Sequence, residues 1–551
     1  MRSIFSYILL ILVNVLSLNA QTPVPLSKAA ADVDKLLANY NFNNGPGLAV
    51  AVIRDGEVVY EKGMGIANLE YHTPITAATV FQVASVSKQF TVFAILLLEQ
   101  EGKLNLNDDI RKYLPELPDY GHVITIQHLA NHTSGLRDIT ALANITGTRE
   151  TDLLSNDQAV KLITSQLSLN FTPGDEFEYS NSGYILLAEI VKRVSGQTFA
   201  TFAQSRIFES LNMKNSQFID DPEVIVNNRA YSYYQYDSVY YKSILNHSFV
   251  GSTGLNTNTD DLCLWAMNFE KKIIGNEALF SQMIEKSRLN DGTVIPYGLG
   301  LENRTYKGLE VIFHGGGIAG YGSYILRVPA YNFSIVYMCN SHVFHPLDIV
   351  YGIVDCYLAD KEKFPEKVKM DHKIPSGFTG DYEIFPGYVF SFSIKNDTLF
   401  QSVYGDTNKI ALIRLSNNEF SFPAIPHSRF VFSPLKNQSC EKLRWHISDF
   451  SYVGKRVALK KIETDGTLPE GIVGLYYNAE LNSVYRLEVQ DGKLVAVHSR
   501  NGESTLTLFQ PNLYVADFGA LEFIYNNKQE IIGFNLMVQG IRKMKFEKLK
   551  N

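Results

Sequence analysis

The sequence predicts an α+β domain, an antiparallel sheet flanked by helices with a helical subdomain, followed by two all-β antiparallel barrel-like domains. The first domain is predicted because strand-like segments near residue 50 and again after residue 297 enclose a mainly helical stretch. The tail is predicted because short strands rich in aromatic and β-branched residues recur from Phe378 onward. We therefore expect domains at 21–365, 375–463 and 467–551, with a charged, Pro-containing linker after the first.

The chain begins with a segment typical of a secretory signal peptide, expected over residues 1–20. Arg2 supplies a positive charge, residues 4–18 an apolar core, and Ala20 a cleavage point. Leu18 occupies the −3 position of this cleavage point, where a small residue is usual, so an uncleaved anchor is the alternative. No later apolar run approaches the ~20 residues of a membrane span. We therefore expect a secreted or periplasmic protein with no stable membrane span after cleavage.

The elements of the first domain are expected in the following order. A helix over 29–40 precedes a hairpin, whose strands 48–53 and 57–60 flank a turn at Asp55 and Gly56. The next expected helices carry the apolar run 91–98 and cover residues 104–114, 125–130 and 185–194. Strands are then expected at 297–302, 310–313, 323–328 and 333–340.

The tail contains an internal repeat. Residues 374–382 match residues 468–476, and the Gly-x-Arg segment that ends at Arg456 resembles the one that ends at Arg542. Each copy has room for about eight strands, which suits a small closed barrel or a strongly curled meander. One continuous sandwich across both copies is the alternative.

A Ser-x-x-Lys motif lies at the start of the most apolar helix. Residues three apart share a helix face, so the amine of Lys88 is expected near the hydroxyl of Ser85. The helix N-terminus favours a developing alkoxide, and burial disfavours the ammonium form of Lys88. The pair therefore suits a nucleophile and its base, although a helix cap with a solvated lysine has the same pattern.

Three further segments accompany this motif. Tyr179 and Asn181 lie two residues apart on a loop before an apolar helix, so both side chains can point into one cleft. A glycine run follows His314 at the end of a strand, where glycines let a substrate backbone lie against the strand edge. The third segment is the loop 132–136, with the sequence His-Thr-Ser-Gly-Leu.

Several other chemistries are excluded. The formal net charge of −7 gives no basis for nucleic-acid binding. The glycine run 315–320 fits a dinucleotide-binding fingerprint, but a strand follows it where a helix is required. No Cys-x-x-Cys pair is present, so we expect no metal site and no cofactor. Most of the scattered cysteines are expected to be free core thiols: Cys263, Cys339, Cys356 and Cys440.

In this order, the motifs resemble those of the serine β-lactamase and penicillin-binding-protein superfamily. The branch that the sequence resembles holds class C β-lactamases, D-alanyl-D-alanine carboxypeptidases, D-aminopeptidases and related esterases. The resemblance covers roughly residues 25–360, and the tail is similar to the lipocalin-like C-terminal domains of D-aminopeptidases.

The resemblance implies a role for each motif residue. Ser85 would be the acylated nucleophile, Lys88 its proton acceptor and Tyr179 a second acid/base. Asn181 would bind the amide of the substrate. The further substrate-binding residues would be His314, Gly316 and Gly317, and the backbone N–H groups of Ser85 and Gly317 would form the oxyanion hole.

One position departs from the family pattern. Many relatives carry Lys-Thr-Gly where this chain has His314, Gly315 and Gly316, so binding of a free carboxylate should be weaker and should improve when His314 is charged. We therefore expect an exported serine hydrolase for small peptide-type amides or esters, possibly derived from peptidoglycan. The alternative is a catalytically weak protein that binds cell-wall fragments or peptides.

Overall fold

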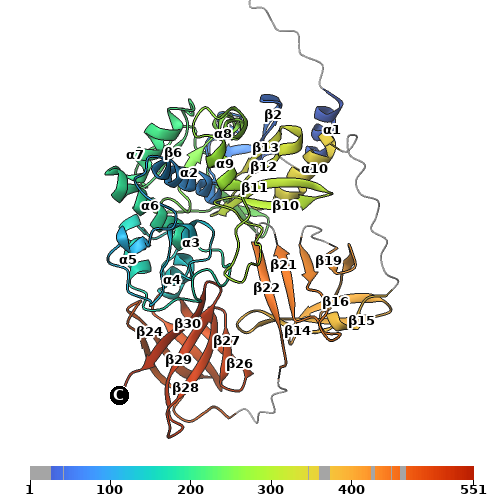
Figure 1. Cartoon of the computed structure of the whole chain (residues 1–551). Coiled ribbons are helices and arrows are strands. Elements are labelled where there is room, and N and C mark those ends of the chain that lie inside the picture. Colours follow the sequence, from blue (N-terminus) through green and yellow to red (C-terminus); the bar gives the residue numbers. More distant parts are fainter. Residues whose placement is uncertain are drawn as a thin grey trace, which may run out of the picture.

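A computed structural model of the chain describes residues 27–550, except 41–42, 345, 359–372, 424–427, 448–449 and 460–466. The expected signal peptide and most of the expected linker lie outside the described residues. Figure 1 shows a mixed α/β domain and, beside it, two separate all-β regions formed by the tail.

The mixed domain is built on a six-stranded sheet in the order β10-β11-β12-β13-β1-β2, with every neighbouring pair antiparallel. Leu48 lies opposite Cys339, so strands from the two ends of the domain meet at the centre of the sheet, as predicted. The strands are β1 (Leu48–Arg54), β2 (Glu57–Met64), β10 (Glu302–Tyr306), β11 (Leu309–Ile318), β12 (Tyr321–Val328) and β13 (Phe333–Cys339).

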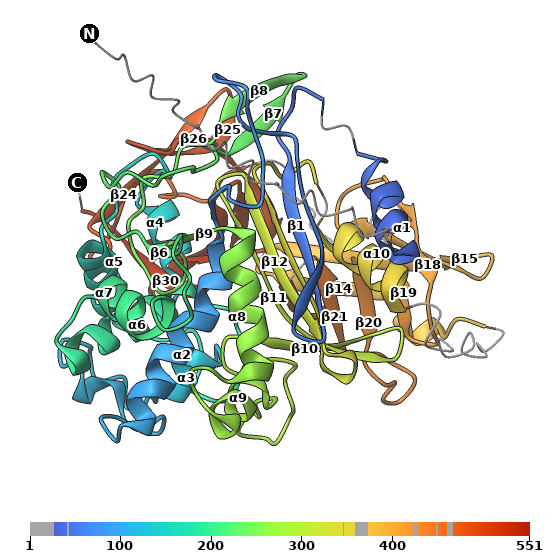
Figure 2. The same cartoon turned by 90° about the horizontal axis from the view of Figure 1, so that it is seen from above.

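Helices cover both faces of this sheet (Figure 2). The helices α1 (Lys28–Leu37) and α10 (Pro346–Leu358) lie on one face, and α8 (Thr259–Lys271) lies on the other. Because side chains alternate along a strand, Val50 packs on the α1 side and Ala51 on the α8 side. The centre of the sheet is therefore buried on both faces.

The helical subdomain surrounds α2 (Ser87–Gln100), which is buried along nearly its whole length, as predicted. Phe90 and Phe93 pack on Trp265, with ring centroids 4.3 and 5.2 Å apart. The remaining helices are α3 (Ile126–Ala130), α4 (Ile139–Ile145), α5 (Asn156–Thr164), α6 (Asn181–Ser195), α7 (Phe199–Ala203) and α9 (Glu277–Ile284). The short strands are β3 (Ile66–Asn68), β4 (Thr73–Pro74), β5 (Phe81–Gln82), β6 (Gln217–Phe218), β7 (Tyr233–Tyr236), β8 (Val239–Lys242) and β9 (Leu255–Thr257).

Two expected elements of this domain are wrong. The segment 104–114 is irregular except for a 3₁₀ turn, Ile110–Lys112, because Asp108 and Asn105 side chains accept backbone N–H groups and compete with helical bonds. The segment 297–302 is a turn with Gly300 at φ +72°, and the strand begins only at Glu302.

Each copy of the tail repeat forms its own sheet, so a continuous sandwich is wrong. The first copy, here called the curled sheet, has nine strands: β14 (Gly380–Phe385), β15 (Tyr388–Lys395), β16 (Thr398–Val403), β17 (Ile410–Ala411), β18 (Ile413–Arg414), β19 (Glu419–Ser421), β20 (Arg429–Phe432), β21 (Lys442–Ile447) and β22 (Phe450–Val457). The second copy, here called the C-terminal barrel, closes with eight: β23 (Gly474–Asn478), β24 (Ser483–Gln490), β25 (Lys493–His498), β26 (Gly502–Gln510), β27 (Leu513–Ala516), β28 (Gly519–Tyr525), β29 (Ile531–Val538) and β30 (Ile541–Lys548).

The first half of the predicted repeat is confirmed by a shared hydrogen bond. Tyr382 and Tyr476 occupy matching positions, and both are fully buried. Each hydroxyl donates to the carbonyl four residues earlier, at Phe378 (3.2 Å) and Ile472 (2.7 Å). The two copies therefore begin with the same local structure.

The second half of the repeat was predicted in the wrong register. Arg456 pairs across the sheet with Tyr382, whereas the residue that pairs with Tyr476 is Lys548. Arg456 donates to the carbonyl of Gly377, and Lys548 donates to the carbonyl of Gly471. Each glycine lies in the turn before the first strand of its copy. Strand pairing thus matches Arg456 with Lys548 and not with Arg542.

The C-terminal barrel packs against α4 of the mixed domain (Figure 1). Ala141, Leu142 and Ile145 belong to the same buried apolar cluster as the interior of the barrel. The Tyr485 hydroxyl also donates to the carbonyl of Ile145 at 3.1 Å. The barrel therefore shares a core with the helical subdomain.

All four cysteines are free, and Cys356 alone is half-buried while the other three are buried, as expected of core thiols. Within the part of the chain that the structure describes, no helix has the length and apolar character to cross a membrane.

Candidate active site

Ser85 lies in a short 3₁₀ turn, Ala84–Val86, between β5 and the start of α2. Ala84 has φ +45°, a conformation that residues with a Cβ rarely adopt. The neighbours Ala84 and Val86 are buried, whereas Ser85 is half-buried. The strained turn therefore presents the Ser85 hydroxyl at the surface of a packed core.

Lys88 is buried in the first turn of α2, with its side chain directed at Ser85. Its Nζ lies 3.0 Å from Ser85 Oγ, 2.9 Å from Asn181 Oδ1 and 2.8 Å from the carbonyl oxygen of Ser252. Burial lowers the pKa of Lys88 to about 7, against the opposing attraction of Asp138. A neutral amine able to accept the Ser85 proton is therefore well populated near pH 7.

Aromatic rings enclose the Lys88 amine. The Nζ atom lies 4.9 Å from the ring centroid of Tyr179 and 5.3 Å from that of Tyr184. His132, from the loop 132–136, packs on the Tyr179 ring at 4.2 Å and accepts a hydrogen bond from the Ser180 N–H at 3.1 Å. This loop therefore fixes the segment that carries Tyr179.

Asn181 is the first residue of α6 and connects Lys88 to Asp138. Its side-chain oxygen accepts from Lys88, and its backbone N–H donates to Asp138 Oδ2 at 2.6 Å. The side chain of the N-cap residue Ser180 accepts no backbone N–H of α6. The Asp138 carboxylate, at the start of α4, accepts the Asn181 N–H in its place. Sequence reasoning missed Asp138, whose available signal was an acidic residue directly before the apolar helix α4.

The glycines of β11 let this strand approach the nucleophile. A Cβ on Gly316 would lie 2.4 Å from the Val83 carbonyl oxygen and 2.9 Å from the Ser85 nitrogen, so a side chain is excluded there. A Cβ on Gly317 would meet no atom closer than 3.6 Å, and Gly317 is exposed. Gly316 therefore lies against the backbone at Ser85, whereas the space beside Gly317 is open to solvent.

His314 is buried, and both of its ring nitrogens have partners. Nδ1 lies 2.6 Å from the Gly315 carbonyl oxygen and Nε2 lies 3.0 Å from the Tyr297 hydroxyl. A neutral ring that donates from Nδ1 and accepts at Nε2 satisfies both contacts. Burial lowers the pKa of His314 to about 3, so the ring stays neutral near pH 7 and becomes charged only well below pH 5.

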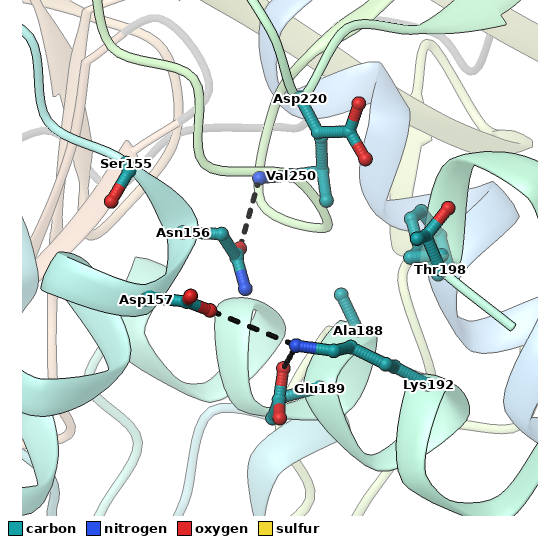
Figure 3. Close-up of a pocket in the computed structure, with 10 residues that line it drawn as sticks. Ser155, Asn156, Asp157, Ala188, Glu189, Lys192, Thr198, Asp220 and Val250 are labelled. Atoms are coloured by element: carbon teal, nitrogen blue, oxygen red, sulfur yellow. Dashed lines mark hydrogen bonds and ion pairs between the residues drawn. The ribbon is translucent and has the colours of Figure 1, made fainter. Parts of the chain in front are cut away.

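A cavity of about 210 Å³ lies elsewhere, about two turns along α6 from Asn181 (Figure 3). Its lining includes Asp157, Glu189 and Asp220, and Lys192 lies between the first two at 3.7 and 3.2 Å. Ser85 and Lys88 do not line it. In the described ranges, no cluster of three His, Cys, Asp or Glu side chains could hold a metal ion.

Comparison with known proteins agrees with this geometry. The family model described as Beta-lactamase matches residues 33–351. A D-aminopeptidase of Gluconobacter oxydans (strain 621H) is 31% identical over 54% of this chain and 56% of its own length. A penicillin-binding protein of Bacillus subtilis (strain 168) is 28% identical over 68% of this chain and 88% of its own. The chain thus spans about half the length of the D-aminopeptidase.

Among solved structures, the octameric penicillin-binding protein homologue from Pyrococcus abyssi has a TM-score of 0.54 at 20% identity. The alignment covers 87% of this chain and 99% of that one. This likeness concerns the fold, and the family model covers more than half of the chain. The chain therefore belongs to the beta-lactamase and penicillin-binding-protein superfamily.

Proposed function

We propose that this protein is a serine hydrolase that cleaves amide or ester bonds of small peptide-type substrates through a covalent acyl-enzyme. The observation that carries the proposal is the 3.0 Å contact between Ser85 Oγ and the buried amine of Lys88, whose pKa is lowered to about 7. A nucleophile beside a base that is neutral near the working pH is the requirement for serine acylation.

The chemistry follows from the positions of the side chains. Neutral Lys88 accepts the proton of Ser85 as Oγ attacks the substrate carbonyl, and the backbone N–H groups of Ser85 and Gly317 stabilise the oxyanion. Tyr179, whose ring lies beside the Lys88 amine, passes a proton to the leaving group. Water then attacks the acyl-enzyme in the reverse sense: its proton passes to Tyr179, and Lys88 returns a proton to Ser85 Oγ as the acyl bond breaks.

Substrates without a terminal carboxylate fit this site best. The relative in Gluconobacter oxydans is a D-aminopeptidase, which supports an amide or peptide substrate. The resemblance implies lysine at the position of His314 in many members of the superfamily, whereas the buried neutral ring of His314 offers no charge to a carboxylate. The substrate class proposed is therefore aminoacyl amides, and short peptides or esters whose leaving end carries no free carboxylate.

Acylation is tested by labelling with a serine-directed fluorophosphonate and intact-mass analysis. The wild type should gain one adduct, on Ser85, and Ser85→Ala should gain none. Ser87→Ala is the matched control, because the Ser87 hydroxyl only accepts a structural bond from the Leu255 N–H at 3.2 Å. An unlabelled wild type would support the alternative of a binding protein without turnover.

Substrate preference is tested with D- and L-aminoacyl amides, p-nitrophenyl esters and a chromogenic cephalosporin. A matched ester pair, with and without a terminal carboxylate, tests the role of His314. The uncharged ester should have the higher kcat/KM, and the ratio should stay constant from pH 5 to pH 8, because His314 is neutral throughout this range. A ratio that falls on acidification would contradict the neutral ring.

A secreted or periplasmic location is proposed from the sequence of residues 1–20. Fractionation of cells that express the full chain, followed by N-terminal sequencing of the product, tests it. A cytoplasmic product that retains Met1 would contradict it.

A further inference from the structure

Asp138 lies outside the catalytic motifs but contacts two elements of the site. Its carboxylate accepts the Thr140 N–H at 2.8 Å, which caps α4, and the Asn181 N–H at 2.6 Å, which caps α6. The residue is only 9% exposed. Its position therefore links the start of α4 to the residue that contacts Lys88.

The C-terminal barrel fixes the position of Asp138. The Asp138 N–H donates to the Gly540 carbonyl in the β29–β30 turn at 3.1 Å. The turn also approaches closely, since a Cβ on Gly540 would lie 2.8 Å from the Asp138 Cβ. The carbonyl of Gly540 accepts a second bond, from Asn170 Nδ2 at 2.9 Å. The turn therefore fits against the start of α4.

A second contact from the barrel reaches the segment before Tyr179. Arg542, at the start of β30, forms a bidentate pair with Glu176 at 2.8 and 3.1 Å and contacts Glu178 at 3.1 Å. Its guanidinium also lies 4.8 Å from the ring centroid of Phe171. Bidentate arginine pairs fix both distance and orientation. The segment 176–178 is thereby held one residue before Tyr179.

We propose that the C-terminal barrel is part of the acylation machinery, with Asp138 as a positioning residue that sets the location of Asn181 beside Lys88. Arg542 acts with it by fixing the segment that carries Tyr179. This inference rests on the proposed acylation of Ser85.

The charge of Asp138 has a predictable effect on the pH profile. The titratable or charged groups near Lys88 are Tyr179, Tyr184, His132, His314 and Asp138, and Glu178, which pairs with Arg542, lies near Asp138. The pKa values of both histidines lie below their usual range, so they stay neutral near pH 7. Because Asp138 raises the pKa of Lys88 against burial, loss of its charge should lower that pKa. The acidic limb of kcat/KM should therefore move to lower pH.

Asp138→Asn removes the charge and one of the two acceptor oxygens, so that only one of the N–H groups of Thr140 and Asn181 keeps its partner. We expect the limb to move down by about half a pH unit and the maximal acylation rate to fall about tenfold. Titration of ¹³Cε-labelled lysine by NMR reads Lys88 directly, with Lys88→Arg identifying its signal, and does not depend on turnover. An unmoved Lys88 midpoint would overturn the inference.

Arg542→Met tests the barrel, and Arg500→Met is its matched control. Arg500 also joins the barrel to the mixed domain, through Asp152 at 2.5 Å, but away from the segment before Tyr179. Arg542→Met should slow labelling of Ser85 about tenfold, and Arg500→Met should change it less than about twofold, at similar losses in Tm. Equal labelling rates for the two variants would overturn the inference, whereas an unlabelled wild type would overturn the proposed function.

Discussion

The curled sheet and the C-terminal barrel begin with the same tyrosine hydrogen bond, but the barrel contacts the active-site loops more closely. The curled sheet contributes Lys455, whose Nζ lies 4.0 Å from Glu176. The barrel contributes Arg542 at 2.8 Å from the same carboxylate and shares an apolar cluster with α4. The two copies thus share the local structure at which they begin, but they differ in strand arrangement and in their contacts with the mixed domain.

The largest effect is expected from removal of the barrel. A chain ending at residue 459 would expose Ala141, Leu142 and Ile145 of α4 and release Asp138. We expect Ser85 labelling to fall at least about 100-fold, because catalytic groups displaced by 1 Å lose about that much. Labelling and circular dichroism on the truncated chain measure this. Full labelling of the truncated chain would show that the contacts of the barrel with the mixed domain do not affect acylation of Ser85.

A matched pair of core substitutions separates stability from function. Tyr382→Ala and Tyr476→Ala should each lower the unfolding free energy by about 3 kcal/mol, because both side chains are fully buried. The Tyr476 variant should also slow Ser85 labelling, since it loosens the barrel behind α4. Denaturant unfolding and labelling rates check both. If only the Tyr382 variant were labelled more slowly, the curled sheet and not the barrel would be the region that supports acylation.

The pH profile offers a further comparison. The Lys88 amine is the base only when neutral, so acylation should increase about tenfold per pH unit below pH 7 and level off above it. Arg456→Met, in the curled sheet, should leave this limb in place, because Arg456 bonds within its own sheet to Gly377 and Tyr382. Rates of labelling between pH 5 and pH 9 test it. If Arg456→Met shifted the pH dependence of labelling, the curled sheet would also affect the pKa of Lys88.

The smallest effects are expected at the residues that match across the repeat. Arg456 makes several hydrogen bonds and Lys548 donates to Gly471 O. We expect Arg456→Met to cost about 2 kcal/mol and Lys548→Met about 1 kcal/mol of unfolding free energy. Urea titrations of the two variants give these values. A larger loss for Lys548→Met would reverse the order of the two sites.

The sequence was sufficient to predict contacts between residues that lie close together in the chain. Ser85 and Lys88 are one helical turn apart, so their contact follows from the helix alone. Asp138 could not be found this way, because its role depends on Asn181, 43 residues later, and on a barrel turn some 400 residues later. These partners meet only through tertiary packing.

Errors in the predicted elements have the same origin. Residues 104–114 have a helical apolar pattern, but Asn105 and Asp108 satisfy backbone N–H groups locally, and the apolar side chains are buried without a helix. The match of Arg456 with Arg542 was a short sequence likeness, and strand register overrode it.

The burial of Lys88 also has a consequence for the free energy of folding. The unfolded chain holds this lysine protonated up to its ordinary pKa of 10.5, whereas the folded chain releases the proton near pH 7. Folding is therefore disfavoured below pH 7 by about 5 kcal/mol, and this penalty disappears as the pH rises from 7 toward 10.5. A substitution that replaces Lys88 with an apolar side chain would abolish acylation and remove this penalty, but it would also leave the Asn181 side-chain oxygen and the Ser252 carbonyl oxygen without their donor. Below pH 7 the fold therefore has a cost in stability that exists only because the site buries its base.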